Sequence, residues 1–174
     1  METLINDFDV FLCKGNSVTS EGITTVSNGK YSHSAQALWI NNTLCIFDAQ
    51  KEGSFPREYN RWKSEFGYEF DVFRPPFEVN SVQYSKDCIN YFGVDYDYKH
   101  LFFGFWRKII SAKKVKDKYK NNNKFICTEL TAKLIKQSSF YFLLSPIQDQ
   151  QNFTPDDLYF YLVKNKFSHV LKNY

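Results

Sequence analysis

The feature that most constrains the fold is a pair of short apolar segments that meet at two consecutive asparagines. Residues 35–40 (AQALWI) precede Asn41-Asn42, and residues 43–49 (TLCIFDA) follow them. Asparagine tolerates the positive φ that a two-residue hairpin turn requires. The sequence therefore predicts an antiparallel hairpin at this point, and hence a β-sheet as one part of the fold.

Strands and helices are predicted on both sides of this hairpin. The aromatic residues at 55, 59, 62 and 66 have the spacing of one helix face, and Pro56 suits the first position of that helix. Thr154-Pro155 has the pattern of a helix start, because threonine caps the helix and proline occupies its first position. The other predicted elements are strands at 8–13, 68–74 and 167–171 and helices at 80–92 and 127–137. Short strands with separate helices predict an α+β fold, and the absence of a linker or repeat predicts one domain over 1–174.

The composition excludes several classes of protein. Hydrophobic residues make up 43% of the chain, which argues against disorder. No apolar run approaches the roughly 18 residues of a membrane span, and the first residues lack the pattern of a secretion signal. We therefore expect a cytoplasmic or virion-associated protein. The four cysteines form no CxxC pair, so we expect free thiols and no metal or cofactor.

One basic segment interrupts a mildly acidic chain. Residues 107–124 carry eight Lys or Arg and one Asp, so their formal charge is +7, while the remainder of the chain is −4. The segment has a single arginine, which argues against nucleic-acid recognition. It is either a solvated loop or a surface that binds an anionic membrane or substrate.

Two positions suggest a pairing of an imidazole with a carboxylate. His33 stands where a loop enters a predicted strand, and Asp48 ends the next strand. A turn at Asn41-Asn42 places residue 33 opposite about residue 50, so the two side chains would be close. A carboxylate beside an imidazole fixes its tautomer and raises its basicity. The alternative is a surface histidine beside an unrelated aspartate.

Cys127 is the candidate nucleophile. It begins the predicted helix CTELTAKLIKQ, where the helix dipole lowers the pKa of a thiol. The other cysteines lie in apolar patterns typical of the core, and Cys127 could equally be a buried structural thiol. Glu129, two residues on, is explained more simply as a helix-capping residue than as a catalytic acid. Together, Cys127, His33 and Asp48 have the side chains of a thiol nucleophile, its base and the group that orients the base.

Six blocks of the sequence, taken in order, resemble the circularly permuted NlpC-type, YiiX-like branch of the papain fold, a group related to lecithin retinol acyltransferase. They are NDFDVFLCKGNSVTSEGI, YSHSAQAL, IFDAQKEG, YFGVDYDYKHLF, FICTELTAKLI and NFTPDDLYFYL. The blocks leave out most of residues 50–80 and the basic segment. The chain departs from the family where Asp7-Phe8-Asp9 replaces an opening Gly-Asp pair, and Glu52 competes with Asp48 for the third catalytic position.

The resemblance implies a permuted papain-like domain with a small antiparallel sheet against the nucleophile helix. It also implies a cysteine hydrolase of the amidase or peptidase type, acting on an amide, thioester or ester bond of cell-wall peptide or lipid origin. Acyl transfer to a lipid is a further option. A non-catalytic binding or structural protein of the same fold, for example one associated with a virus or phage, is the alternative.

The same resemblance implies a tyrosine near the site. Tyr31, Tyr96 and Tyr98 are the candidates for contacting substrate, although Tyr96 and Tyr98 could instead form an aromatic wall of the core. The substrate and the oligomeric state stay open at this stage.

Overall fold

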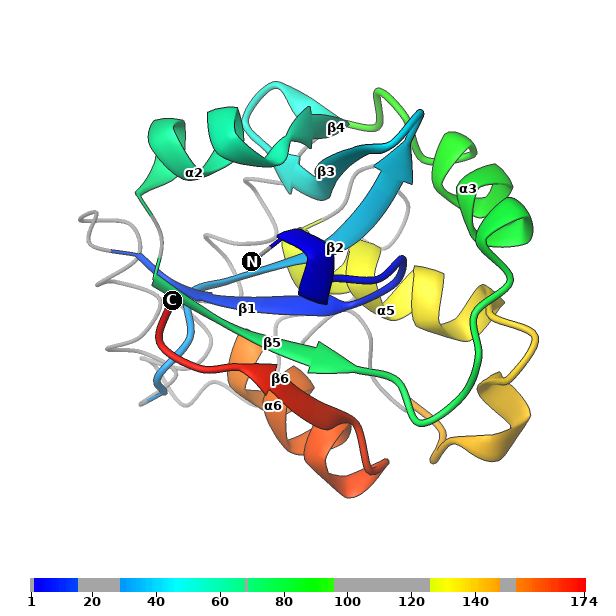
Figure 1. The fold of residues 1–174 in the computed structure, drawn as a ribbon. Coiled ribbons are helices and arrows are strands. Elements are labelled where there is room, and N and C mark those ends of the chain that lie inside the picture. Colours follow the sequence, from blue (N-terminus) through cyan, green and yellow to red (C-terminus); the bar gives the residue numbers. More distant parts are fainter. Residues whose placement is uncertain (1, 16–28, 68, 96–125, 148–152) are drawn as a thin grey trace, which may run out of the picture.

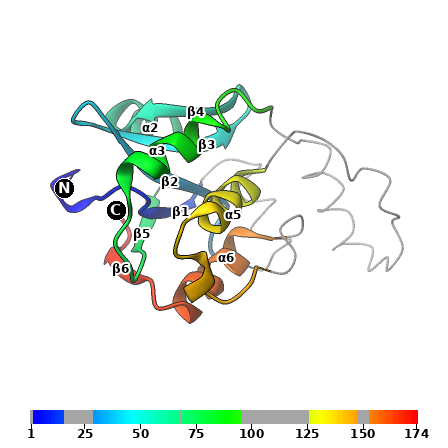
Figure 2. The same cartoon turned by 90° about the vertical axis from the view of Figure 1, so that its right-hand side faces the viewer.

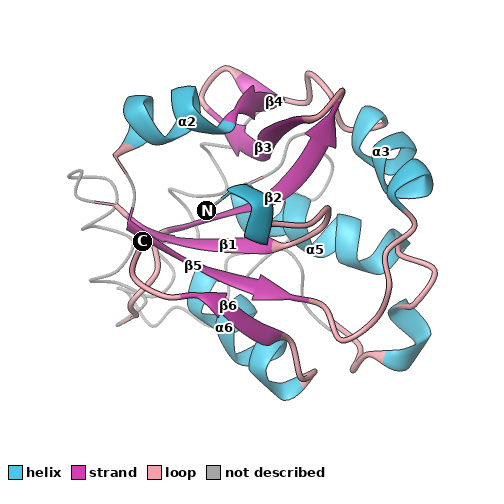
Figure 3. Cartoon of the chain, in the orientation of Figure 1, coloured by secondary structure: helices cyan, strands magenta, loops and turns pink. Residues whose placement is uncertain are grey.

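The protein is described here by a computed structural model that covers residues 2–15, 29–67, 69–95, 126–147 and 153–174 (Figure 1). In chain order the described elements are η1 (Glu2–Leu4), β1 (Val10–Lys14), β2 (His33–Ile40), β3 (Thr43–Gln50), β4 (Gly53–Glu58), α2 (Tyr59–Phe66), β5 (Glu69–Arg74), α3 (Ser81–Ile89), α5 (Cys127–Gln137), η2 (Tyr141–Leu143), α6 (Pro155–Lys164) and β6 (Ser168–Leu171). The six strands form one antiparallel sheet in the order β4-β3-β2-β1-β5-β6. The predicted α+β class is confirmed (Figure 3).

The predicted hairpin joins β2 to β3. Asn41 and Asn42 have φ values of 48° and 62°, the left-handed conformation that asparagine accepts. The strands pair with Gln36 opposite Phe47, the register that a turn at these two residues requires. The register of β2 and β3 therefore follows from the two turn residues.

Two apolar layers cover the two faces of the sheet. Along β1, successive side chains point to opposite faces of the sheet. Val10 and Leu12 belong to one buried cluster, and Phe11 belongs to the other. Helices α3, α5 and α6 contribute side chains to the first cluster, and α2 contributes Tyr59 and Trp62 to the second. Figure 2 shows α5 and α6 together on one side of the strands. The aromatic residues thus form two cores with the sheet between them.

The predicted helix start at Pro56 is wrong. Pro56 lies within β4, opposite Phe47, and the helix begins only at Tyr59. Because β4 is an edge strand, its outward side needs no backbone donor, and proline is accepted there. The helix ends at Phe66, the last aromatic residue of the predicted face, and Gly67 caps it in the left-handed conformation.

The other helix boundaries follow their capping residues. The Asn80 side chain accepts from the backbone N–H of Gln83 at 3.0 Å, although α3 ends three residues before the predicted limit. In α6 the Thr154 hydroxyl accepts from the N–H of Asp157 at 3.1 Å, and Pro155 is the first helical residue.

None of the helices in the described part of the chain has the length and apolar character that a membrane span requires.

Candidate functional site

The site is centred on the N-terminus of α5. Cys127 is the first residue of this helix, and its side chain is close to fully buried. The Glu129 carboxylate accepts from the backbone N–H of Ile126 at 3.0 Å, so Glu129 caps the helix start. The sulfur therefore lies at the positive end of the helix dipole.

Hydrogen bonds fix this helix end against β2. The Thr131 hydroxyl donates to the carbonyl of Cys127 at 3.1 Å, and the Ser34 hydroxyl lies 3.1 Å from the Thr131 oxygen. One residue beyond Cys127, the Thr128 hydroxyl donates to the backbone carbonyl of Phe153, just before α6. All three hydroxyl-bearing residues on β2 and α5 are buried. The position of Cys127 is thus tied both to the sheet and to the segment before the next helix.

The structure brings His33 and Asp48 together. His33 Nε2 lies 2.8 Å from Asp48 Oδ2, and the two side chains are 7% and 0% exposed. A carboxylate accepts only, so this contact places the proton of a neutral imidazole on Nε2 and leaves Nδ1 as an acceptor. Glu52, the competing carboxylate, is 65% exposed and contacts Arg57 at 3.5 Å. Of the two candidates, Asp48 is the one bound to His33 Nε2.

Asp48 accepts from four N–H groups. Besides His33, the Trp62 indole donates to Oδ2 at 3.0 Å and the Gln50 amide donates to the same oxygen at 2.7 Å. The Arg57 guanidinium donates to Oδ1 at 2.8 Å. A buried carboxylate is costly to desolvate unless such donors satisfy it. These four donors therefore hold the carboxylate in one orientation.

His33 also lies against Cys127. Burial raises the pKa of the Cys127 thiol, but the charge of His33 and a hydrogen bond with it act in the opposite direction. Backbone N–H groups of Ser34 and Thr128 add to this effect, and the resulting pKa lies below the ordinary thiol value. This arrangement of sulfur, imidazole and carboxylate is able to stabilise a thiolate and to accept or return a proton.

The other three cysteines differ from Cys127 in this respect. All three are buried, and all four cysteines are free thiols. Burial raises the pKa of Cys13 and of Cys45, and it raises the pKa of Cys88 to about 12. They behave as small core residues, as the sequence predicts.

Tyr31 takes part in a polar cluster centred on Asp71. Its hydroxyl donates to Asp71, which also accepts from Lys30 Nζ at 3.0 Å and from the backbone N–H of Asn173 at 2.7 Å. The Tyr31 ring packs on Tyr159 of α6, with 5.6 Å between centroids. Tyr31 is 1% exposed, so these contacts give it a structural function, and contact with substrate stays a prediction.

Several predicted features lie outside the described residues. They are Tyr96, Tyr98, the basic segment 107–124 and most of the polar stretch between β1 and β2.

The Asp71 cluster leads to a prediction about stability in acid. Burial alone would raise the pKa of Asp71, but bonds from Tyr31, the Asn173 backbone and Lys30 lower it to about 2. Because the folded value lies below the unfolded one, the stabilisation is present above about pH 4 and is lost as the pH falls toward 2. We expect Asp71→Asn to remove about 2 kcal/mol of pH-dependent stability.

Urea unfolding at neutral pH and at successively lower pH measures this effect. Glu69→Gln, an exposed acid on the same strand, is the matched control and should keep the wild-type pH dependence. The same acid dependence in Asp71→Asn as in the wild type would contradict the assignment.

Sequence reasoning missed the partners of Asp48. Gln50 is two residues after Asp48, so strand alternation alone puts both on one face. A buried Trp62 needs a partner for its indole N–H, which was a usable signal, although the sequence assigned it only to a helix face. Arg57 was placed in a helix because of Pro56, and its position on β4 depends on pairing that no local pattern shows.

Comparison with known proteins gives the fold. No family model matches the chain, and no curated protein matches it. Among solved structures, the chain is similar to the crystal structure of the metalloprotein YiiX from Escherichia coli O157:H7. The TM-score is 0.69 at 14% identity, and the alignment covers 98% of this chain and 99% of that one. The chain therefore has a YiiX-like fold.

Proposed function

We propose that this protein is a thiol hydrolase in which Cys127, His33 and Asp48 act together on an acyl bond. The observation that supports the proposal most is the position of His33, which contacts Asp48 through Nε2 at 2.8 Å and also interacts with the Cys127 sulfur. An imidazole between a thiol and a carboxylate can hold the thiol proton and then deliver it. The dipole of α5 and the backbone N–H groups of Ser34 and Thr128 also favour the negative charge of the Cys127 thiolate.

In the proposed reaction the Cys127 thiolate attacks the carbonyl carbon of the substrate. A carbon–sulfur bond forms, and the carbonyl oxygen gains the negative charge near the N-terminus of α5. His33 donates its proton to the leaving group as the original acyl bond breaks. A water molecule, deprotonated by His33, then attacks the thioester and regenerates the thiolate.

The finer features of the fold belong to the same proposal. We infer a permuted papain-like core over residues 1–174, because the nucleophile helix follows the histidine strand in the chain and packs against it. The amidase or peptidase type, with cell-wall peptide or lipid acyl groups as substrates, rests on the sequence resemblance. Binding of an anionic surface by residues 107–124 and a cytoplasmic or virion-associated location rest on the sequence as well.

The described residues do not fit a metal centre, although YiiX is called a metalloprotein. No group of three or more His, Cys, Asp or Glu in the described part of the chain is placed to hold an ion. The two oxygens of Asp48 already accept N–H donors, and one of these is the Arg57 guanidinium. No step of the proposed reaction therefore involves a metal.

Trapping the acyl-enzyme tests the proposal. The protein is mixed with activated esters, thioesters and peptide anilides, quenched quickly, and analysed by mass spectrometry of its cysteine peptides. We expect the acyl group on Cys127, and we expect Cys127→Ala to lower turnover by about 10³-fold or more. Transfer of the acyl group to an added amine or alcohol, in place of water, would identify an acyltransferase.

Cys45→Ala is the matched control, because Cys45 is buried to a similar extent as Cys127. It should leave acylation unchanged. If no acyl donor of any class modifies Cys127, the site is not catalytic, and the protein is a binding or structural member of this fold.

A further inference from the structure

The Arg57 guanidinium binds the carboxylate that orients the proposed base. Its guanidinium lies 2.8 Å from Asp48 Oδ1, on the opposite oxygen from His33. The Arg57 side chain is 13% exposed, and Asp48 is fully buried. A simple Cys–His–Asp arrangement needs no such cation, so its presence calls for an explanation.

The sheet register fixes this contact. Asp48 on β3 pairs with Phe55, and Arg57 lies two residues further along β4, on the same face. Diagonal neighbours of this kind are within reach of long side chains. The position of Arg57 thus follows from the backbone pairing.

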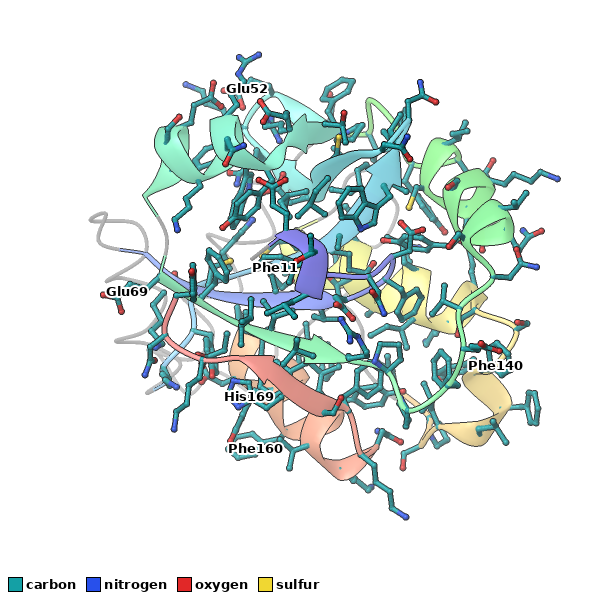
Figure 4. All side chains as sticks on the ribbon, in the orientation of Figure 1. Phe11, Glu52, Glu69, Phe140, Phe160 and His169 are labelled. Atoms are coloured by element: carbon teal, nitrogen blue, oxygen red, sulfur yellow. The ribbon has the colours of Figure 1, made fainter. Side chains whose placement is uncertain are left out.

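Two further contacts hold the guanidinium in place. The Phe66 ring of α2 lies 5.7 Å from its central carbon, and Glu52 contacts its second nitrogen at 3.5 Å. Glu52 projects at the rim of the molecule near β4 (Figure 4). The arginine is therefore bound between a buried carboxylate, an exposed one and an aromatic face.

We propose that Arg57 is a positioning residue that shares the Asp48 carboxylate with His33 and so limits how strongly Asp48 retains a proton on the imidazole. The inference rests on the proposed function. An imidazolium opposite a carboxylate that is already paired with a guanidinium is stabilised less than one opposite a free carboxylate. The leaving group needs that proton, so a base that held it too tightly would be a poor acid in the next step.

The protonation of His33 depends on the charged and titratable groups around it. In the described part of the chain they include Asp48 from β3, Cys127 from α5, Cys13 from β1 and, through Asp48, Arg57 from β4. The contacts that α2 and the end of β3 make with this group, Trp62 and Gln50, are uncharged. Arg57 is thus the cation to remove.

The titration of His33 by NMR tests the proposal without any substrate. The chain has three histidines, so its imidazole signals are few and can be assigned with a His33→Gln variant. The Cys127→Ala background removes the thiol, so the result does not depend on thiol chemistry. We expect Arg57→Gln, which keeps a donor but loses the charge, to raise the His33 midpoint by roughly 1 pH unit, a tenfold change in proton affinity.

Arg57→Lys is the matched control, because it keeps the charge and loses the forked geometry. It should shift the midpoint by less than half as much. An unchanged midpoint in Arg57→Gln, or equal shifts in the Gln and Lys variants, would overturn the proposal. Arg57→Met serves as a second uncharged variant if Arg57→Gln does not fold.

The NMR titration of His33 and the trapping of the acyl-enzyme test different proposals, so their results can differ. A shifted midpoint without acylation would reject the hydrolase and keep the effect of Arg57 on His33. Acylation without a shift would keep the hydrolase and reject this effect.

Discussion

Replacing Asp48 with alanine is expected to lower the free energy of unfolding by about 3–5 kcal/mol, because it leaves a largely buried guanidinium without its buried carboxylate. The Trp62 indole and the His33 ring lose the same acceptor. A buried donor without an acceptor carries its full desolvation cost. Chemical denaturation at neutral pH, followed by tryptophan fluorescence, measures the loss.

The same change should impair the site. Without Asp48, His33 Nε2 has no carboxylate to orient the ring or to favour its charged form. We therefore expect alkylation of Cys127 by iodoacetamide to slow at neutral pH in the fraction that remains folded.

Two matched variants separate these effects from a general loss of charge. Glu65→Ala removes a carboxylate from the exposed ion pair with Arg61 at 2.7 Å, and it should leave stability and alkylation nearly unchanged. Asp48→Asn keeps one acceptor oxygen, so it should retain more of the His33 contact than alanine does. A stability of Asp48→Ala equal to that of Glu65→Ala would show that the four donors do not depend on Asp48.

Features that depend on neighbouring residues were predictable from the sequence. The turn at Asn41-Asn42 requires a positive φ, and asparagine is one of few residues that accept it. The start of α6 needs only Thr154 and Pro155, and the bounds of α5 match the prediction at both ends. In each case the physical cause lies within a few residues of the feature.

Features that depend on distant pairing were not predictable. Pro56 satisfies both a first helical turn and an edge strand, and only the partner strand β3 decides between them. The order of strands β1, β5 and β6 likewise comes from long-range contacts. The proline alone therefore does not distinguish a helix start from an edge strand.

The candidate site shows the same division. His33 and Asp48 are joined by a single hairpin, so their proximity could be inferred from the turn. Cys127 could be placed at a helix start, but its approach to His33 depends on α5 packing against β2. Arg57 falls in a segment for which the local pattern predicts a helix, and the strand register alone brings it to Asp48.

The interaction of His33 with the Cys127 sulfur is measured most directly by a pH titration of the Cys127 thiolate. Ultraviolet absorbance follows it, taken as the difference between wild type and Cys127→Ala. The structure places the pKa of Cys127 below the ordinary thiol value, mainly because His33 and two backbone N–H groups outweigh the effect of burial. The thiolate should therefore persist to a lower pH than that of an ordinary cysteine and should decline as the pH falls through the lowered pKa. The other three cysteines, whose pKa values are raised, cancel in the difference.

His33→Ala removes the charge and the hydrogen bond while burial remains. In that variant we expect the thiolate to form only above the pH of an ordinary cysteine. We expect a wild-type Cys127 midpoint below that of an ordinary cysteine, and a rise of this midpoint in His33→Ala. A wild-type Cys127 that titrates like an ordinary thiol, or one that His33→Ala leaves unchanged, would contradict it.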